Sequence, residues 1–243
     1  MKIILLLAMS FSLFAFDHNH SEWNDILKTN TSVSDKQTSF HYESLKNNQT
    51  KFDSYLNSIE NLSKKEFKKF SKDEKLAFWI NVYNAYTVKL ILNNYPLKSI
   101  KKIGGWFSSP WKIKFIKLFG KKISLDMIEH QIIRKKFNEP RIHFAVNCAS
   151  IGCPSLLTEA FVAKNLNEQL DKAAINFLNN PMKNKYDSKT NTLFLSKIFD
   201  WYGNDFNKKH GSYLEFVKKY IKYPKDVKQK WLDYNWNLNE GKK

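Results

Sequence analysis

The stretch KLAFWINVYNAYTVKLILNNYP, residues 75–96, decides the fold. It is nearly continuous in apolar residues and is longer than a typical strand. Ser71 and Glu74 stand three positions apart just before it, which is the spacing of a capping box at a helix start. Two asparagines and then Pro96 mark its end. The stretch therefore predicts a long, buried helix.

The chain as a whole has the composition of a folded protein with a basic surface. It has 243 residues, of which 42% are hydrophobic and 15% aromatic, which argues against disorder. The net charge of +17 would suit nucleic acid, anionic lipid or an acidic polymer. However, the lysines are scattered in pairs, and the aromatic residues have core-like spacing rather than that of stacking platforms. We therefore expect a solvated lysine-rich surface and no nucleic-acid partner.

Residues 1–16 have the pattern of an export signal. Lys2 precedes an apolar run of about a dozen residues, which is the length of a signal-peptide core and too short to span a bilayer. Ala15 suits the position before the cleaved bond, so we expect cleavage near residues 15–17 and a periplasmic or secreted protein. The alternative is an uncleaved anchor. We expect no transmembrane segment after signal cleavage.

The remaining pattern predicts a mixed fold. Residues 17–39 are polar and are expected to form a poorly ordered lead-in, and residues 40–243 a single domain. Within that domain we expect helices at 40–61, 125–137, 159–179, 197–208 and 212–222, a hairpin over 111–118 and 121–124, and short strands at 141–148 and 192–196. This order indicates an α+β fold, a single mainly helical domain around a small β-sheet.

The segment HFAVNCASIGCPS, residues 143–155, holds both cysteines of the chain, Cys148 and Cys153. A disulfide is permitted by export if the chain turns at 150–152. A zinc site is disfavoured, because four intervening residues are not a usual zinc spacing. A nucleophile would need a thiol of lowered pKa beside a base or a helix N-terminus. The spacing alone leaves the disulfide and the nucleophile open, and we expect no metal or cofactor.

The helix predicted at 125–137 carries an anomaly. On a helical wheel Glu129 lies inside the apolar arc, and His130 lies at its edge. A carboxylate on a core-facing stripe is costly unless it is paired. Glu129 therefore either pairs with a lysine or a backbone group, or belongs to a functional site. His130 is either a boundary residue or part of the same site.

The strand predicted at 141–148 bears on which of two histidines, His130 or His143, can act as a base for Cys148. If it runs straight, alternation turns the side chain of His143 away from Cys148. His130, on the preceding helix, is then the better candidate for a base. A bulge at Asn147 would reverse this choice.

Two asparagines of the long helix are also unexpected. Asn81 and Asn84 stand three apart on one face of an otherwise apolar helix. Buried amides must find hydrogen-bond partners. These two would either brace neighbouring loops, or orient a histidine and donate to an oxyanion.

Five sequence blocks resemble a known family. They occur in the family's order over roughly residues 40–238, and they read AFWINVYNAYTVKLIL…NYPLKSI, GKKISLDMIEHQIIR, EPRIHFAVNCASIGCPSL, LSKIFDWYGNDF and YNWNLN. They are similar to the family called domain of unknown function 547. The resemblance implies a bacterial envelope protein and centres on Glu129, His130, Cys148 and Cys153. It implies that Cys148 is the functional thiol and Cys153 an auxiliary one, and it favours His130 over His143.

The residues and the resemblance together predict a cysteine-dependent acyl-transfer enzyme that hydrolyses a peptide, an amide or a thiol-containing conjugate. Cys148 would be the nucleophile and His130 the general base. A likeness to papain-like thiol hydrolases is an analogy of residue types only. The supporting or substrate-binding residues would be Asn81, Asn84, Glu129, Arg134, Asn147 and Cys153. Arg134 would suit a carboxylate-bearing substrate.

The alternative is a non-enzymatic envelope module for binding or structure. Cys148 and Cys153 would then form a disulfide, and the WFSSPW loop, residues 106–111, would hold a partner or simply cover the core. The sequence does not distinguish a catalytic role of Asp205 from a role in helix packing.

Overall fold

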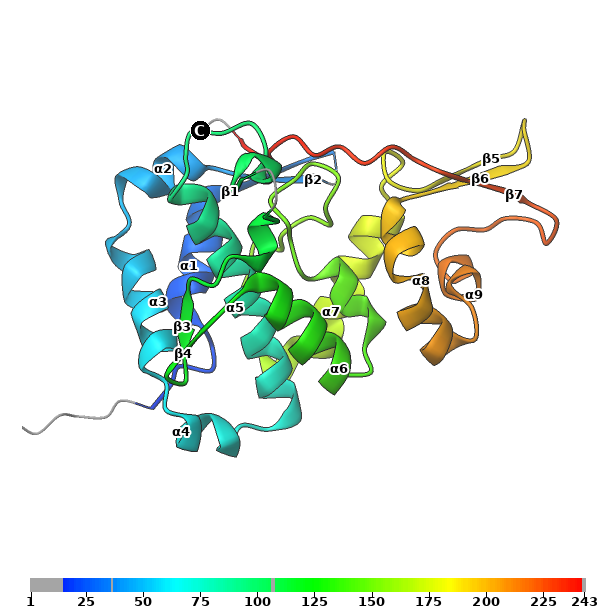
Figure 1. Ribbon diagram of the computed structural model, residues 1–243. Helices are drawn as coiled ribbons and strands as arrows, with labels where there is room; N and C mark the ends of the chain where they lie inside the picture. Colours follow the sequence, from blue (N-terminus) through cyan, green and yellow to red (C-terminus); the bar gives the residue numbers. More distant parts are fainter. Residues whose placement is uncertain (1–14, 36, 106–107, 242–243) are drawn as a thin grey trace, which may run out of the picture.

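Helix α5 (Lys72–Leu92) runs through the centre of the computed structural model, which describes residues 15–35, 37–105 and 108–241 (Figure 1). The predicted capping box is confirmed. The Glu74 N–H donates to Ser71 Oγ at 3.1 Å, and the Ser71 N–H donates to Glu74 Oε2 at 2.6 Å. From Leu76 onward almost every side chain of α5 is buried, so this helix forms the centre of the hydrophobic core.

The fold is α+β, as predicted, with helices dominating. The α-helices of the described residues are α1 (Ser21–Asn30), α2 (Tyr42–Asn47), α3 (Thr50–Asn61), α4 (Lys64–Lys69), α5, α6 (Arg134–Lys136), α7 (Leu166–Leu178), α8 (Lys197–His210) and α9 (Tyr213–Lys218). The short 3₁₀ helices are η1 (Ile100–Lys102), η2 (Pro110–Lys112), η4 (Pro140–Phe144) and η5 (Ala163–Asn165), and η3 (Met127–Ile133) is a π-helix.

The strands form small sheets rather than one. They are β1 (Thr31–Ser34), β2 (Gln37–Phe40), β3 (Ile116–Leu118), β4 (Lys121–Ile123), β5 (Lys185–Asp187), β6 (Thr192–Leu195) and β7 (Lys228–Trp231). In the part of the chain that the structure describes, β1–β2 and β3–β4 pair antiparallel, and β5, β6 and β7 form one sheet in which β6 and β7 are parallel.

The chain after β7 ties distant parts of the molecule together. This C-terminal segment (residues 232–241) runs along one edge from the β5–β6–β7 sheet toward β1 and β2 (Figure 1). It makes bridges between Leu238 and Ser150 and between Glu240 and Phe40. The segment therefore contacts both the first sheet and the loop that holds the cysteines.

Several predicted elements are confirmed, with shorter bounds. The hairpin is β3–β4, and it turns at Phe119 and Gly120, which both have positive φ, as a tight two-residue hairpin turn requires. The predicted helix at 125–137 is present, with a π-helical stretch inside it. The helix predicted at 40–61 is divided into α2 and α3.

The expectation of a poorly ordered lead-in at 17–39 is wrong. These residues form α1, β1 and most of β2. The polar composition concealed a small apolar face, because Trp23, Ile26 and Leu27 are fully or nearly fully buried. Three such side chains are enough to hold a short helix against α3 and the core.

The described part of the chain begins at residue 15, near the end of the predicted export signal. Residues 1–14 of the predicted export signal lie outside the described residues. Phe16 belongs to the core: it is 9% exposed, and its ring lies 5.7 Å from that of Phe70 and 5.4 Å from that of Phe78. Its N–H donates to Glu66 Oε1 at 2.8 Å. Phe16 is therefore part of the folded domain.

The predicted strand at 141–148 is wrong, because residues 140–144 form the 3₁₀ helix η4. Pro140 begins it, and the side chain of Glu139 caps it by accepting the Arg141 N–H at 3.1 Å. A short buried apolar run does not by itself distinguish a strand from a helical turn. Because these residues are helical, strand alternation does not determine the direction of the His143 side chain.

The described residues contain no helix with the length and apolar character needed to span a bilayer. Trp106 and Phe107 of the WFSSPW loop lie outside the described residues, whereas Ser109 and Trp111 line the pocket described next.

Candidate functional site

A pocket of about 380 Å³ brings together most of the residues that the sequence singled out. Its wall is formed by α5, η2, η3, η4, the cysteine loop (residues 147–154), α8 and the C-terminal segment. The lining residues are Tyr83, Ser109, Trp111, Asp126, Glu129, His130, His143, Val146, Cys148, Cys153, Pro154, Ile198, Trp201, Tyr202, Tyr234 and Trp236. A concave, largely aromatic pocket with a few polar groups has the character of a ligand site.

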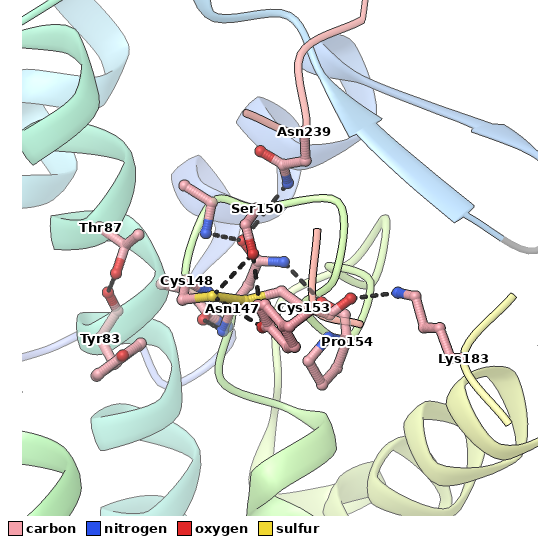
Figure 2. The surroundings of a disulfide bond; sticks show 12 residues. Tyr83, Thr87, Asn147, Cys148, Ser150, Cys153, Pro154, Lys183 and Asn239 are labelled. Atoms are coloured by element: carbon pink, nitrogen blue, oxygen red, sulfur yellow. Dashed lines mark hydrogen bonds between the residues drawn. A yellow bond between two sulfur atoms is a disulfide. The ribbon is translucent and has the colours of Figure 1, made fainter. Parts of the chain in front are cut away.

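Cys148 and Cys153 are joined in a disulfide, with their Cα atoms 6.0 Å apart (Figure 2). The two sulfurs differ in environment. Cys153 is 2% exposed, whereas Cys148 is partly exposed. Cys148 Sγ also lies 3.2 Å from Ser150 Oγ and 3.3 Å from the Tyr234 hydroxyl. Cys148 is thus the more accessible sulfur, and two hydroxyl groups surround it.

The cysteine loop is fixed by side-chain hydrogen bonds. The Asn147 amide donates to the Pro154 carbonyl at 2.6 Å, and its oxygen accepts the Ala149 N–H at 2.8 Å. Ala149 has a φ of 59°, which this local bonding supports. Asn147 therefore closes the loop, and its buried side chain does not line the pocket.

The C-terminal segment covers the other side of the loop. The Gly152 N–H donates to the Asn235 carbonyl at 2.8 Å, and the Ile151 N–H to the Asn237 carbonyl at 2.9 Å. A Cβ atom on Gly152 would lie 2.9 Å from the ring of Tyr234. Glycine is required here because the segment approaches so closely, and this approach places the Tyr234 hydroxyl against Cys148.

Glu129 is buried, as its place on the helical wheel predicted, but a lysine does not pair with it. Its carboxylate accepts hydrogen bonds from the hydroxyls of Tyr83 and Tyr202. Burial, and then the nearby Glu129 charge, raise the pKa of both tyrosines well above the ordinary value. Both hydroxyls therefore stay protonated and act as donors. The π-helical stretch that carries Glu129 is a geometry that often accompanies functional sites.

His143 is held by Asp205. Its Nε2 lies 2.8 Å from Asp205 Oδ2, and its ring stacks on Tyr202 with centroids 4.1 Å apart. Burial lowers the pKa of His143, and the hydrogen bond to Asp205 only partly opposes this. The ring is therefore neutral near pH 7, and Nε2 carries the proton that Asp205 accepts.

The other ring nitrogen of His143 is unpaired. Nδ1 is buried and has no hydrogen-bond partner among residues 15–35, 37–105 and 108–241. A buried nitrogen with a free lone pair is unusual. Because His143 also lines the pocket, this nitrogen is a candidate acceptor for a proton or a ligand donor.

Asp205 is the centre of a charged network. Its carboxylate accepts two hydrogen bonds from Arg134, at 2.6 Å to Nε and 3.1 Å to Nη2, besides the one from His143. Burial by itself would raise the pKa of Asp205, but these donors lower it below the ordinary value. Asp205 is thus a permanent anion that orients both partners.

Arg134, which was predicted to suit a carboxylate-bearing substrate, is engaged by side chains of the protein itself. Asp205 occupies two of its donor groups, and a third, Nη1, lies 3.0 Å from His130 Nδ1. Arg134 is also absent from the pocket lining. The charges that do line the pocket include the carboxylates of Asp126 and Glu129, so the expectation of a carboxylate-bearing substrate loses its basis.

His130 lies in the pocket wall, one residue after Glu129. Its Nδ1 accepts from Arg134, because a guanidinium has no acceptor. Nε2 must then carry the proton of the neutral ring, and it lies 3.9 Å from Asp126 Oδ1. His130 is thus a candidate donor on the pocket wall, and its Nδ1 is already engaged by Arg134, whereas Nδ1 of His143 has no partner within the described residues.

Asn81 and Asn84 brace the fold, which was one of the two alternatives. Asn81 donates to the Phe161 carbonyl at 2.7 Å and accepts the Phe161 N–H at 3.0 Å. Asn84 donates to the Ala145 carbonyl at 2.9 Å and accepts the Asn147 N–H at 2.8 Å. Each amide thus donates one hydrogen bond and accepts one in fixing the chain near the cysteine loop, and neither lines the pocket.

The sequence reasoning missed the aromatic wall and the His143–Asp205 pair. The wall contains Trp201, Tyr202, Tyr234 and Trp236, and the ring centroids of Tyr234 and Trp236 are 4.6 Å apart. Two sequence motifs that are separated along the chain, DWYGND and YNWN, carry these residues and were the signal that could have identified them. Within the described part of the chain, no three His, Cys, Asp or Glu side chains are grouped to hold a metal ion.

These features define a mainly helical α+β protein with a disulfide-bearing, aromatic-walled pocket. Residues 67–178 match the model of the family described as "Protein of unknown function, DUF547", which confirms the family recognised from the motifs. No curated protein and no solved structure matches the chain. The matched region includes Glu129, His130, His143 and both cysteines, whereas Asp205 and the aromatic wall from α8 and the C-terminal segment lie beyond it.

Proposed function

We propose that the protein is a cysteine-dependent acyl-transfer enzyme, active when Cys148 is reduced, that hydrolyses an amide, peptide or thiol-conjugate bond. The observation that carries this proposal is the unpaired Nδ1 of His143, whose ring is oriented by Asp205, in the pocket that Cys148 also lines. A base held by a third group beside a thiol is the arrangement that activates a nucleophile.

In the proposed reaction the thiol of Cys148 gives its proton to His143 Nδ1, and Cys148 Sγ bonds to the acyl carbon. The bond to the leaving nitrogen or sulfur then breaks, and His143 returns the proton to the leaving group. Water attacks the acyl-enzyme and restores the thiol. His130, with Nε2–H turned to the pocket side, is the proposed donor to the carbonyl oxygen, in place of the base role predicted from the sequence.

The test is acylation of reduced protein by p-nitrophenyl acetate, followed by intact mass and peptide mapping. We expect one acetyl group on Cys148 in the wild type and in Cys153→Ser, with Cys153→Ser reacting even without a reductant. His143→Gln should slow acylation by about 10²–10⁴-fold, the usual contribution of a general base. The matched control is His18→Gln, because the His18 side chain is 40% exposed and is not among the residues that line the pocket.

Two outcomes would overturn the proposal. One is acylation of Cys148→Ala at the wild-type rate. The other is an equal rate in His143→Gln and wild type, with circular dichroism showing that the variant is folded. A smaller loss in His130→Gln than in His143→Gln would support the assignment of His143 as the base, and the reverse order would return that role to His130.

The disulfide favours a second candidate function, a binding module of the envelope. In that case the oxidised pocket is the functional state, and its aromatic wall holds a ligand. A small-molecule library screened by thermal shift would identify binders of the oxidised wild type. Binding that Trp201→Ala abolishes, together with no acylation of the reduced protein, would establish this function instead.

We also infer export, with cleavage between Ala15 and Phe16. A disulfide is typical of oxidising compartments, and Phe16 is part of the core, so a later cut would remove a core side chain. The new ammonium group on Phe16 would pair with Glu66, which already accepts the Phe16 N–H. N-terminal sequencing of protein from periplasm and cytoplasm tests this, and an intact Met1 in both fractions would refute it.

A further inference from the structure

The two cysteines of the disulfide differ in exposure, and this difference suggests thiol–disulfide exchange. Both cysteines line the pocket, but Cys148 is partly exposed, whereas Cys153 is 2% exposed. An incoming thiolate therefore reaches Cys148 Sγ more readily than Cys153 Sγ. Which sulfur is attacked, and how well the other one leaves, determine the course of thiol–disulfide exchange.

Cys153 is placed to leave as a thiolate. The Cys148 N–H donates to Cys153 Sγ at 2.8 Å, and such a bond strengthens when its acceptor becomes an anion. Lys183 is 5% exposed, and its ammonium group donates to the Cys153 carbonyl (Figure 2). Burial lowers the pKa of Lys183 to about 7, so near pH 7 the protonated fraction of Lys183 places a positive charge at the Cys153 backbone and favours negative charge on the departing sulfur.

The pocket beside Cys148 selects the kind of thiol. Its aromatic wall suits an organic body, and the ring of Trp201 lies 4.9 Å from that of Tyr234. Asp126 and Glu129 add negative charge to the lining, while Arg134 is engaged by Asp205 and Lys101 lies over the ring of Trp236 at the rim. The lining therefore disfavours an anionic thiol.

We propose that the Cys148–Cys153 disulfide is a reaction site for neutral or cationic organic thiols, which enter the pocket and form a mixed disulfide on Cys148. The thiolate attacks Cys148 Sγ, a new sulfur–sulfur bond forms there, and the electron pair of the old bond leaves on Cys153. A second thiol molecule attacks the mixed disulfide, is oxidised with the first to their disulfide, and releases Cys148 as a thiolate. This step supplies the reduced Cys148 on which the proposed function rests.

The experiment treats oxidised protein with cysteamine or with 3-mercaptopropionate, quenches with acid, and reads the adduct by intact mass and peptide mapping. Each rate is divided by the rate of the same thiol with a synthetic peptide of residues 146–155 in its cyclic disulfide form. That ratio removes the intrinsic reactivity of the thiol and leaves the effect of the fold.

We expect the adduct on Cys148 and a ratio at least about fivefold higher for cysteamine, since one carboxylate near a half-buried site changes a rate by this order. Asp126→Asn should reduce that preference, and Asp233→Asn, an exposed control outside the pocket lining, should not. An adduct on Cys153, or equal ratios for the two thiols, would overturn the proposal.

The thiol-adduct experiment and the acylation experiment can fail independently. If the adduct forms on Cys148 but the fully reduced protein acylates no substrate, the thiol reaction stands and the enzyme proposal fails. If the folded protein excludes both thiols while Cys153→Ser is acylated on Cys148, the enzyme proposal stands and this inference fails.

Discussion

At the scale of single residues, the site is determined by how each polar group is paired. Glu129, Asp205 and His143 are all buried or nearly so, and a buried polar group is tolerated only where partners compensate the lost hydration. Glu129 has two tyrosine hydroxyls and Asp205 has three donors. Among these three residues, Nδ1 of His143 is the exception, and a buried polar atom without a partner requires a specific explanation, such as a catalytic role.

Replacing Asp205 with asparagine tests this pairing. Asp205→Asn leaves the guanidinium of Arg134 without its carboxylate, so we expect a loss of about 1–3 kcal/mol in the free energy of unfolding. The pKa of His143 should also fall further, because the hydrogen bond to Asp205 raises it.

Urea unfolding at pH 7 measures the first effect. The matched control is Asp200→Asn on the same helix, whose surface ion pair with Lys197 contributes at most about 1 kcal/mol. Equal losses in the two variants would contradict the central role of Asp205.

At the scale of elements, the pocket depends on contacts between segments that are far apart in the chain. The cysteine loop is held from one side by Asn84 of α5 and from the other by the C-terminal segment. The contact at Gly152 leaves no room for a side chain, because the nearest neighbours include the backbone nitrogen of Asn235.

Gly152→Ala should therefore push the C-terminal segment off the loop. A Cβ atom would lie 3.0 Å from Asn235 N and 2.9 Å from the Tyr234 ring, and such overpacking costs about 1–3 kcal/mol. The free energy of unfolding should fall by this amount, and hydrogen exchange at Gly152 and Ile151, whose N–H groups bond to the segment, should speed up.

Gly105→Ala is the control, because no atom of the described residues beyond its chain neighbours lies within 4 Å of the position that the new methyl group would take. If both variants unfold at the same urea concentration as the wild type, the segment is not held against the loop as described.

At the scale of the whole molecule, the basic charge and the buried histidines make stability depend on pH. Burial lowers the pKa of His20 to about 3, from an ordinary value of 6.5. Its Nδ1 lies 2.7 Å from the Tyr55 hydroxyl in the interior. Below pH 6.5 the unfolded chain binds a proton that the folded chain does not bind, so stability falls as the pH falls.

We expect the free energy of unfolding to decrease by about 1.4 kcal/mol per pH unit from this residue alone, between pH 6.5 and about 3. His20→Asn should reduce the slope, and asparagine suits the positive φ of 48° at this position. Parallel pH profiles for wild type and His20→Asn would contradict the assignment.

The sequence by itself determined the elements whose signals are local. The capping box and apolar run specified α5, the turn at Phe119 and Gly120 specified β3–β4, and the wheel position of Glu129 showed that a carboxylate would be buried. The family motifs also indicated which residues gather around the thiols, and the match to residues 67–178 agrees with them.

Tertiary structure alone decided the identities of the partners. His143 meets Asp205 across 62 positions, and Cys148 meets Tyr234 across 86. No periodicity encodes such contacts, because they depend on how helices and loops pack in three dimensions. The same holds for η4, which a buried apolar run left undecided between strand and helix. Glu139 caps its start locally, but Asn84 of α5 donates to the Ala145 carbonyl at its end.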